Sequence, residues 1–95
     1  MREYTRVHVW VKGRVQGVGF RAFVHRNAVE IGVTGWVRNV GYDTVEAVAE
    51  GTQAQIERFL EMVRRGPGIS RVDESHEERQ PATGEFDAFR MRASR

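Results

Sequence analysis

The stretch VHVWVKGRVQGVGFR, residues 7–21, decides the fold because its periodicity changes partway along from that of a strand to that of a helix. Apolar and polar residues alternate over 7–12, which predicts a half-buried β-strand with its valines on one face. From Phe20 the apolar residues recur at helical spacing until Gly32, a residue type common just past helix ends. Residues 13–19 are therefore predicted to form a glycine-containing loop that joins a strand to a helix.

Two further strands and a second helix follow. Strands are predicted over 33–39 and 44–50, joined by a hairpin tip over 40–43 whose Gly and Asp tolerate turn geometry. The second helix has a T-x-x-Q capping box that begins at Thr52, then apolar residues at i, i+3, i+4 and i+7. The run Gly66-Pro67-Gly68 ends it.

The remaining residues predict two weaker strands. Residues 69–77 are polar and partly acidic, which suits an exposed strand at a sheet edge. After a turn over 81–85, residues 86–92 predict a short closing strand.

The order of these elements is strand, helix, strand, strand, helix, strand, and a final strand. This is the split β-α-β-β-α-β pattern of a ferredoxin-like α+β sandwich. Two helices would cover one face of a mostly antiparallel sheet. The other face would stay open, and Trp10 and Trp36 are expected to lie partly on it.

Length and composition exclude several kinds of site. Ninety-five residues predict a single domain, 1–95, with a core too small for a large enclosed cofactor. The lack of cysteine excludes a disulfide framework, a thiolate metal site and a cysteine nucleophile. The three histidines have no metal-ligand spacing, so neither a metal ion nor a cofactor is expected. No apolar run is long enough to span a membrane and no signal peptide is evident, which predicts a cytoplasmic protein without a membrane partner.

The charge pattern gives little evidence for nucleic acid. The net charge is +2 and the pI is near 9.7, and Lys12 is the only lysine among 15 basic residues. Because arginine stays protonated at high pH, the pI is high without a large positive charge. Arginine also binds phosphate as a planar fork, so a phosphate-bearing ligand is worth considering.

The loop over 13–19 has the features of an anion site. Gly17 and Gly19 allow backbone conformations in which successive amides converge on one anion, beside the positive end of a helix dipole. Arg21 can add two donors from the first helical turn. The loop lacks the residues of a P-loop and of a dinucleotide fingerprint. On the glycine spacing alone, a tight turn between strand and helix is the preferred explanation.

Three segments together resemble the acylphosphatase family. These are V-K-G-R-V-Q-G-V-G-F-R at 11–21, G-W-V-R-N at 35–39 and V-E-A at 45–47, with Gly51 before the second helix and Gly66-Pro67 after it. The resemblance covers essentially the whole chain. It implies a ferredoxin-like fold and the metal-independent hydrolysis of a small acyl phosphate. We also expect a monomer that does not bind nucleic acid.

The resemblance also assigns roles to residues of this sequence. Arg21 matches the family's phosphate-binding arginine and Asn39 its catalytic asparagine, which would orient the attacking water. The amides of the loop match the family's phosphate cradle, whose members here are Val15, Gln16, Gly17, Val18, Gly19, Phe20 and Arg21. One departure is the hairpin tip, where Tyr42-Asp43 stands in place of the family's usual Asp-Gly.

Two alternatives remain. Acylphosphatase-like domains also occur in hydrogenase-maturation proteins that handle carbamoyl phosphate. Ferredoxin-like sheets also include RNA-binding domains, and residues 19–24 echo an aromatic RNA-binding signature. That signature belongs on a central strand, however, whereas here it spans a loop and the start of a helix.

Overall fold

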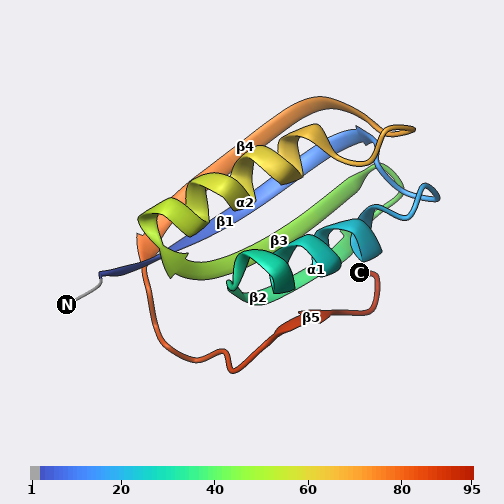
Figure 1. Ribbon diagram of the computed structural model, residues 1–95. Helices are drawn as coiled ribbons and strands as arrows, with labels where there is room; N and C mark the ends of the chain where they lie inside the picture. The colour runs from blue at the N-terminus through green and yellow to red at the C-terminus, as the bar shows by residue number, and fades with distance from the viewer. Residues whose placement is uncertain (1–2) are drawn as a thin grey trace.

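The computed structural model describes residues 3–95 and has two helices packed on a five-stranded sheet (Figure 1). In chain order the elements are β1 (Tyr4–Arg14), α1 (Phe20–Ile31), β2 (Thr34–Val40), β3 (Thr44–Thr52), α2 (Gln53–Arg65), β4 (Arg71–Pro81) and β5 (Phe89–Met91). This order confirms the predicted ferredoxin-like α+β sandwich. Among the described residues, no helix is long and apolar enough to cross a membrane.

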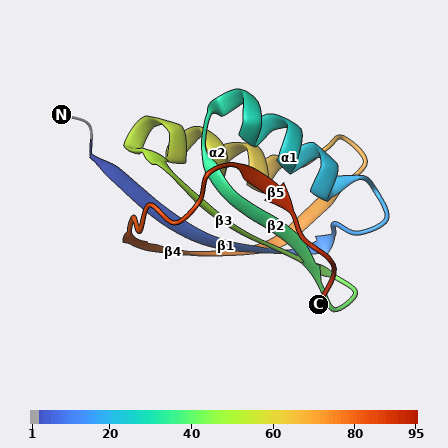
Figure 2. The same cartoon turned by 90° about the horizontal axis from the view of Figure 1, so that it is seen from below.

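The sheet runs β4-β1-β3-β2-β5, so β1 and β3 are central strands. β1 pairs antiparallel with β3 and with β4, β2 pairs antiparallel with β3, and β5 joins β2 in parallel. Both helices lie on the same side of the sheet (Figure 2). The connection from β4 to β5 therefore runs from one edge of the sheet to the other.

The core lies between the sheet and the two helices. Val7, Val9 and Val11 of β1 are each at most 1% exposed, as their alternation predicts. Burial of a side chain of this size contributes about 1.5–3 kcal/mol to folding. The helices supply the largest fully buried side chains, which are Phe20, Ile56, Phe59 and Leu60.

Helix α2 begins with the predicted capping box. The Gln55 amide donates to Thr52 Oγ1 at 3.3 Å, and the Thr52 amide donates to Gln55 Oε1 at 2.8 Å. Gln55 Nε2 also donates to the carbonyl oxygen of Ile31 at 3.2 Å, so the start of α2 is bonded to the end of α1. Two backbone groups at the helix start are thereby satisfied within the protein.

Strands β1 and β4 extend beyond the predicted ranges 7–12 and 69–77, and β4 starts two residues later than expected. The two strands stay paired as far as Arg14, past a register shift at Gly13. A Cβ atom at Gly13 would lie 2.3 Å from the carbonyl oxygen of Arg71, so only glycine fits there. The ends of these strands are set by backbone pairing between them, which side-chain alternation does not reveal. The predicted edge position of β4 is confirmed.

Strand β5 is shorter than the predicted range 86–92. Only Phe89–Met91 pairs with β2, opposite Gly35–Val37. The chain beyond β5 still bonds to β2 and its hairpin, because the Arg92 amide donates to the carbonyl oxygen of Val37 at 2.8 Å. The last residues are therefore held beside the β2–β3 hairpin (Figure 2).

The open face of the sheet carries the two tryptophans, as predicted. Trp36 is 8% exposed, and the guanidinium groups of Arg38 and Arg92 lie 4.7 and 4.6 Å from its ring centroid. Trp10 stacks on the His8 ring at 3.9 Å. The ring faces are thus already in contact with side chains of the protein, which leaves little aromatic surface on which a base could stack.

Two carboxylates are buried on this open face. Glu46 Oε1 accepts from Arg38 Nε, and Glu46 Oε2 lies 2.6 Å from His8 Nε2. Glu50 accepts from Arg6 and from groups of Thr83 and Gly84 in the β4–β5 connection. Burial alone would raise the pKa of each carboxyl, but these hydrogen bonds outweigh burial and lower both pKa values. Glu50 therefore anchors the connection that brings β5 to the far edge of the sheet.

Replacement of Glu50 by glutamine should remove a pH-dependent part of the stability. Because the pKa of Glu50 is lowered on folding, its contribution is complete above the ordinary carboxyl pKa of about 4.5 and is lost as pH falls below it. Removal of one partner of a buried charged group costs about 3–5 kcal/mol. We expect urea denaturation to give a large deficit for Glu50→Gln at pH 7 and a smaller one at pH 3. A deficit that does not change with pH would contradict this account, and exposed Glu61→Gln serves as the control.

Candidate functional site

The loop between β1 and α1 has the conformation that its glycines permit. Gly17 and Gly19 have φ angles of 74° and 75°, in the left-handed region that other residues rarely adopt. A Cβ atom added at either position would meet nothing within 4 Å. The demand for glycine here therefore comes from the backbone angle and not from crowding.

Helix α1 opens directly onto this loop with its first amides available. Its N-cap is Gly19, which has no side chain to cap the helix, and the first turn contains no acidic residue. The first amides of a helix have no intrahelical acceptor, and the helix dipole places partial positive charge there. This end of α1 can therefore donate hydrogen bonds to an anion.

Arg21 lies in the first turn of α1 and is held in place by the other end of the chain. Its Nη1 donates to the carbonyl oxygen of Arg92 at 2.9 Å. One bond uses one of the five N–H groups of the guanidinium, so the others remain for a ligand. The residues after β5 thus help to orient an arginine from the start of α1.

Asn39 lies near the end of β2, directly opposite Val45 of β3. Its carbonyl oxygen accepts from the Arg95 amide at 2.9 Å. Its half-buried side chain makes no hydrogen bond with any residue in the range 3–95. The side-chain amide is therefore available to a ligand or a water molecule.

A cavity of about 330 Å³ brings these features together. Its lining contains seven of the predicted site residues and two that the sequence did not indicate, which are Val15, Gln16, Gly17, Gly19, Phe20, Arg21, Asn39, Ala22 and Met91. Val15 and Phe20 are at most 2% exposed. Val18 is the one predicted member outside this lining, and its side chain packs against the core. The predicted arginine and asparagine, far apart in sequence, thus face the same space.

Ala22 and Met91 were missed for different reasons. Ala22 follows Arg21 in the first helical turn and carries no chemical signal. Met91 joins the cavity lining because β5 pairs in parallel with β2, which places Met91 opposite Val37. Because side chains two residues apart share a face, Met91 lies on the same side of the sheet as buried Phe89, toward the helices. Only the sheet topology could have revealed this neighbour.

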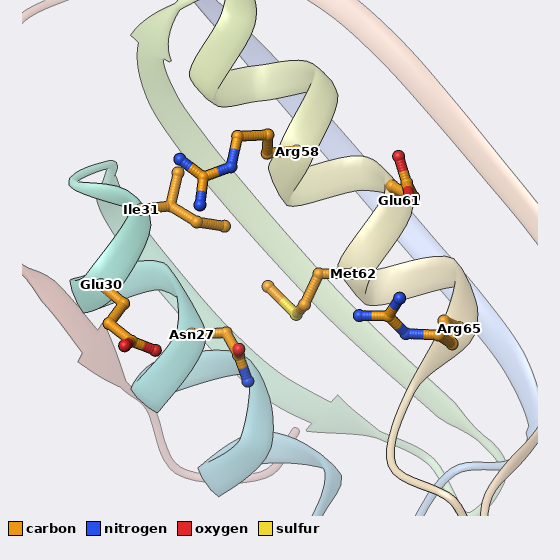
Figure 3. Close-up of a pocket in the computed structure, with 7 residues that line it drawn as sticks. All are labelled: Asn27, Glu30, Ile31, Arg58, Glu61, Met62 and Arg65. Carbon is orange, nitrogen blue, oxygen red and sulfur yellow. The ribbon is translucent and has the colours of Figure 1, made fainter.

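The cavity favours anions because Arg21 is the only charged side chain in its lining. A second hollow of about 310 Å³ lies between α1 and α2 and differs in chemistry (Figure 3). Its lining holds both Arg58 and Arg65 and both Glu30 and Glu61. Mixed charges on two helix surfaces do not select one sign of ligand, so the cavity at the loop is the better candidate.

His25 and Lys12, although near the loop in sequence, lie outside the cavity lining. His25 of α1 is half-buried, with its ring 6.2 Å from that of Phe89. Lys12 pairs with Asp43 at 3.7 Å. Within residues 3–95, no group of three His, Cys, Asp or Glu side chains is arranged to hold a metal ion.

Comparison with known proteins agrees with the motifs. The Acylphosphatase family model matches residues 7–91. The chain is 46% identical over 87 residues to an acylphosphatase of Syntrophotalea carbinolica, covering 92% of this chain and 95% of that one. It is 49% identical over 84 residues to an acylphosphatase of Methylococcus capsulatus, covering 88% and 91%.

Solved structures give the same result. An acylphosphatase from Coxiella burnetii superposes with a TM-score of 0.88 at 37% identity, over 95% of this chain and 94% of that one. Full-length HypF in a phosphate- and nucleotide-bound form superposes with a TM-score of 0.89 at 27% identity. That match covers 99% of this chain but 12% of HypF.

Proposed function

Because this chain belongs to the acylphosphatase family and is an acylphosphatase, we propose that its loop cavity holds the phosphoryl group of a small acyl phosphate and directs water at the phosphorus atom. The observation that carries this proposal is the single cavity lined by the glycine loop, the start of α1, Arg21 and Asn39.

Phosphoryl binding is assigned to the loop amides and Arg21. The uncapped start of α1 and the left-handed glycines Gly17 and Gly19 support a converging set of N–H donors. Arg21 adds a fixed positive charge whose orientation is set by the Arg92 carbonyl. Donors that are fixed in advance stabilise the charge of the transition state at little reorganisation cost, and this is often the largest catalytic contribution.

Water attack is assigned to Asn39. Its free side-chain amide can hold a water molecule in line with the scissile bond. The water oxygen bonds to phosphorus while the bond from phosphorus to the acyl oxygen breaks, and the acyl group leaves as a carboxylate. Because a carboxylate is a stable leaving group, strong general-acid assistance is unnecessary. Asparagine is not a strong base, so the proton of the attacking water passes to an oxygen of the phosphate.

This scheme requires neither a metal ion nor an organic cofactor, because the leaving group and the Arg21 charge supply the needed stabilisation. We further propose a monomeric cytoplasmic enzyme, 1–95 forming one domain, that acts on small molecules and not on nucleic acid. The occupied faces of Trp10 and Trp36 support the last point. The burial of Phe20 in the core supports it as well.

Hydrolysis of benzoyl phosphate in the presence of a chelator tests the proposal. We expect the purified protein to release benzoate and phosphate well above the spontaneous rate, with or without EDTA. No hydrolysis above background would refute the function. Activity that EDTA abolished and added metal restored would refute the metal-independent mechanism.

The second candidate keeps the cavity and changes the substrate to carbamoyl phosphate. The resemblance to acylphosphatase-like domains of proteins that handle carbamoyl phosphate raises this candidate, and the phosphate- and nucleotide-bound HypF superposes on this chain with a TM-score of 0.89. A comparison of kcat/KM for acetyl, benzoyl and carbamoyl phosphate under the same conditions separates the two. A strong preference for carbamoyl phosphate would favour the second candidate.

A further inference from the structure

The side chain of Gln16 joins the phosphate loop to the β2–β3 hairpin. Its Nε2 donates to the carbonyl oxygen of Thr44 at 2.8 Å, and to those of Val40 and Gly41 at 3.2 Å each. An amide nitrogen has only two hydrogens, so one of them is shared between two carbonyls. One half-buried side chain thus satisfies three backbone acceptors at the hairpin end.

The hairpin reached by Gln16 is the one that carries Asn39. Val40 and Thr44 close the β2–β3 ladder, and Gly41 opens the tip with a φ of 60°. Asn39 directly precedes this cluster of carbonyls. Gln16 itself lines the cavity and immediately precedes the glycine part of the loop. The Gln16 side-chain amide therefore connects the two halves of the site, which arise from different parts of the chain.

Apart from Val15 and Val18, which pack in or against the core, the loop has few means of keeping its position. Two of its residues are glycines, and Gly17 and Gly19 have no atom within 4 Å of where a Cβ would lie. The hairpin tip has further bonds, because the Gly41 amide donates to the carbonyl oxygen of Arg95 and the Gly13 amide to that of Asp43, both at 2.9 Å. Catalysis by positioning requires the bound group and the attacking water to be aligned within about 0.5 Å.

We propose that the Gln16 side chain is a positioning residue, which fixes the loop amides relative to Asn39 so that the phosphoryl group and the attacking water stay in line. The inference rests on the proposed function. It concerns the side chain of Gln16, apart from any contact that its backbone amide makes with phosphate. A misplacement of about 1 Å can lower a catalytic rate by about 100-fold.

Separate measurements of kcat and of the inhibition constant of inorganic phosphate test the proposal. Gln16→Met keeps the length of the side chain and removes its donors, and Gln16→Glu turns an acceptor toward the three carbonyls. We expect both variants to lower kcat at least 10-fold, and to change the inhibition constant of inorganic phosphate less than 3-fold. The loop amides and Arg21 remain on one segment, so phosphate binding survives the loss of alignment. Gln53→Met on the exposed side of α2 is the matched control and should change neither value.

A substitution in the hairpin tests the same connection between Gln16 and the hairpin carbonyls. Gly41→Ala should shift the tip carbonyls, because alanine disfavours a φ of 60° although space is open around it. Gly84→Ala is the matched control, with a φ of 72° and equally open surroundings in the β4–β5 connection. We expect Gly41→Ala, but not Gly84→Ala, to lower kcat at least 5-fold. In a Gln16→Met background the Gly41→Ala effect should largely disappear, because the connection is already lost.

The outcomes separate the inference from the function. If the wild type hydrolyses benzoyl phosphate but folded Gln16→Met keeps its kcat, the positioning role is refuted and the function stands. Additive effects in the Gln16 and Gly41 double mutant would also refute it, and so would a fall in phosphate affinity as large as the fall in kcat. If Gln16→Met does not fold, equal kcat values for Gly41→Ala and Gly84→Ala refute it. A wild type with no activity refutes the function and the inference together.

Discussion

Arg21→Ala lowers kcat/KM for benzoyl phosphate by an expected factor of about 10²–10³, the usual loss when a preorganised donor to a developing charge is removed. Arg21 is the only charged side chain in the cavity lining, so no neighbour can replace it. Arg21→Lys should recover only part of the loss, because lysine keeps the charge but cannot bind the Arg92 carbonyl and a phosphate oxygen with one planar fork. The inhibition constant for phosphate should rise in both variants.

The control for Arg21 lies on the same helix. Arg26 is exposed on α1 and outside the cavity, so Arg26→Ala removes the same charge without touching the site. Steady-state kinetics of the three variants, each checked by circular dichroism, gives the comparison. The assignment of Arg21 fails if folded Arg21→Ala stays within 3-fold of the wild type.

Asn39→Ala should lower kcat by about 10²–10³ while it leaves phosphate binding almost unchanged. The reason is that Asn39 is assigned to the water and not to the phosphoryl group. Its side chain bonds to no described residue, so its loss should change the urea midpoint little. Asn39→Asp should be poorly active as well, since a carboxylate beside the phosphoryl group repels it.

The effect of Asn39 is best compared with that of another asparagine. Asn27 on α1 donates to the carbonyl oxygen of Phe23 at 2.8 Å and does not line the loop cavity. Asn27→Ala should retain wild-type kcat even if it loses some stability. A folded Asn39→Ala protein with normal turnover would remove Asn39 from the mechanism.

The parts of the fold that the sequence predicts well depend on local interactions. Three predicted features depend only on residues near one another in the sequence, and the structure confirms each of them. They are the alternation over 7–12, the helical spacing from Phe20 and the Thr52 capping box. The extents of β4 and β5 depend on pairing with strands distant in the sequence. The periodicity of a polar strand contains no information about where its partner ends.

The same distinction applies to the site. Arg21 and the glycines could be selected because their chemistry is evident in one short segment. The bond from Arg21 to the Arg92 carbonyl joins residues 71 positions apart, and the entry of Met91 depends on a parallel pairing of three residues. Neither of these contacts can be inferred from a local sequence pattern. The assigned catalytic roles, the single-domain organisation, the monomeric state and the cytoplasmic location stay predictions.

The central position of β1 has a consequence for how the protein is made. The ribosome completes this strand early, but one of its two partners, β4, is synthesised only after about 60 more residues. Because synthesis proceeds at roughly 5–20 residues per second, the valine-rich strand has at least one unpaired edge for several seconds. Arg6 and Lys12 flank the valine-rich run with charge and so discourage its pairing with other nascent chains. The arrangement also makes folding depend on distant contacts, so the complete chain should fold more slowly than a helical bundle of similar length.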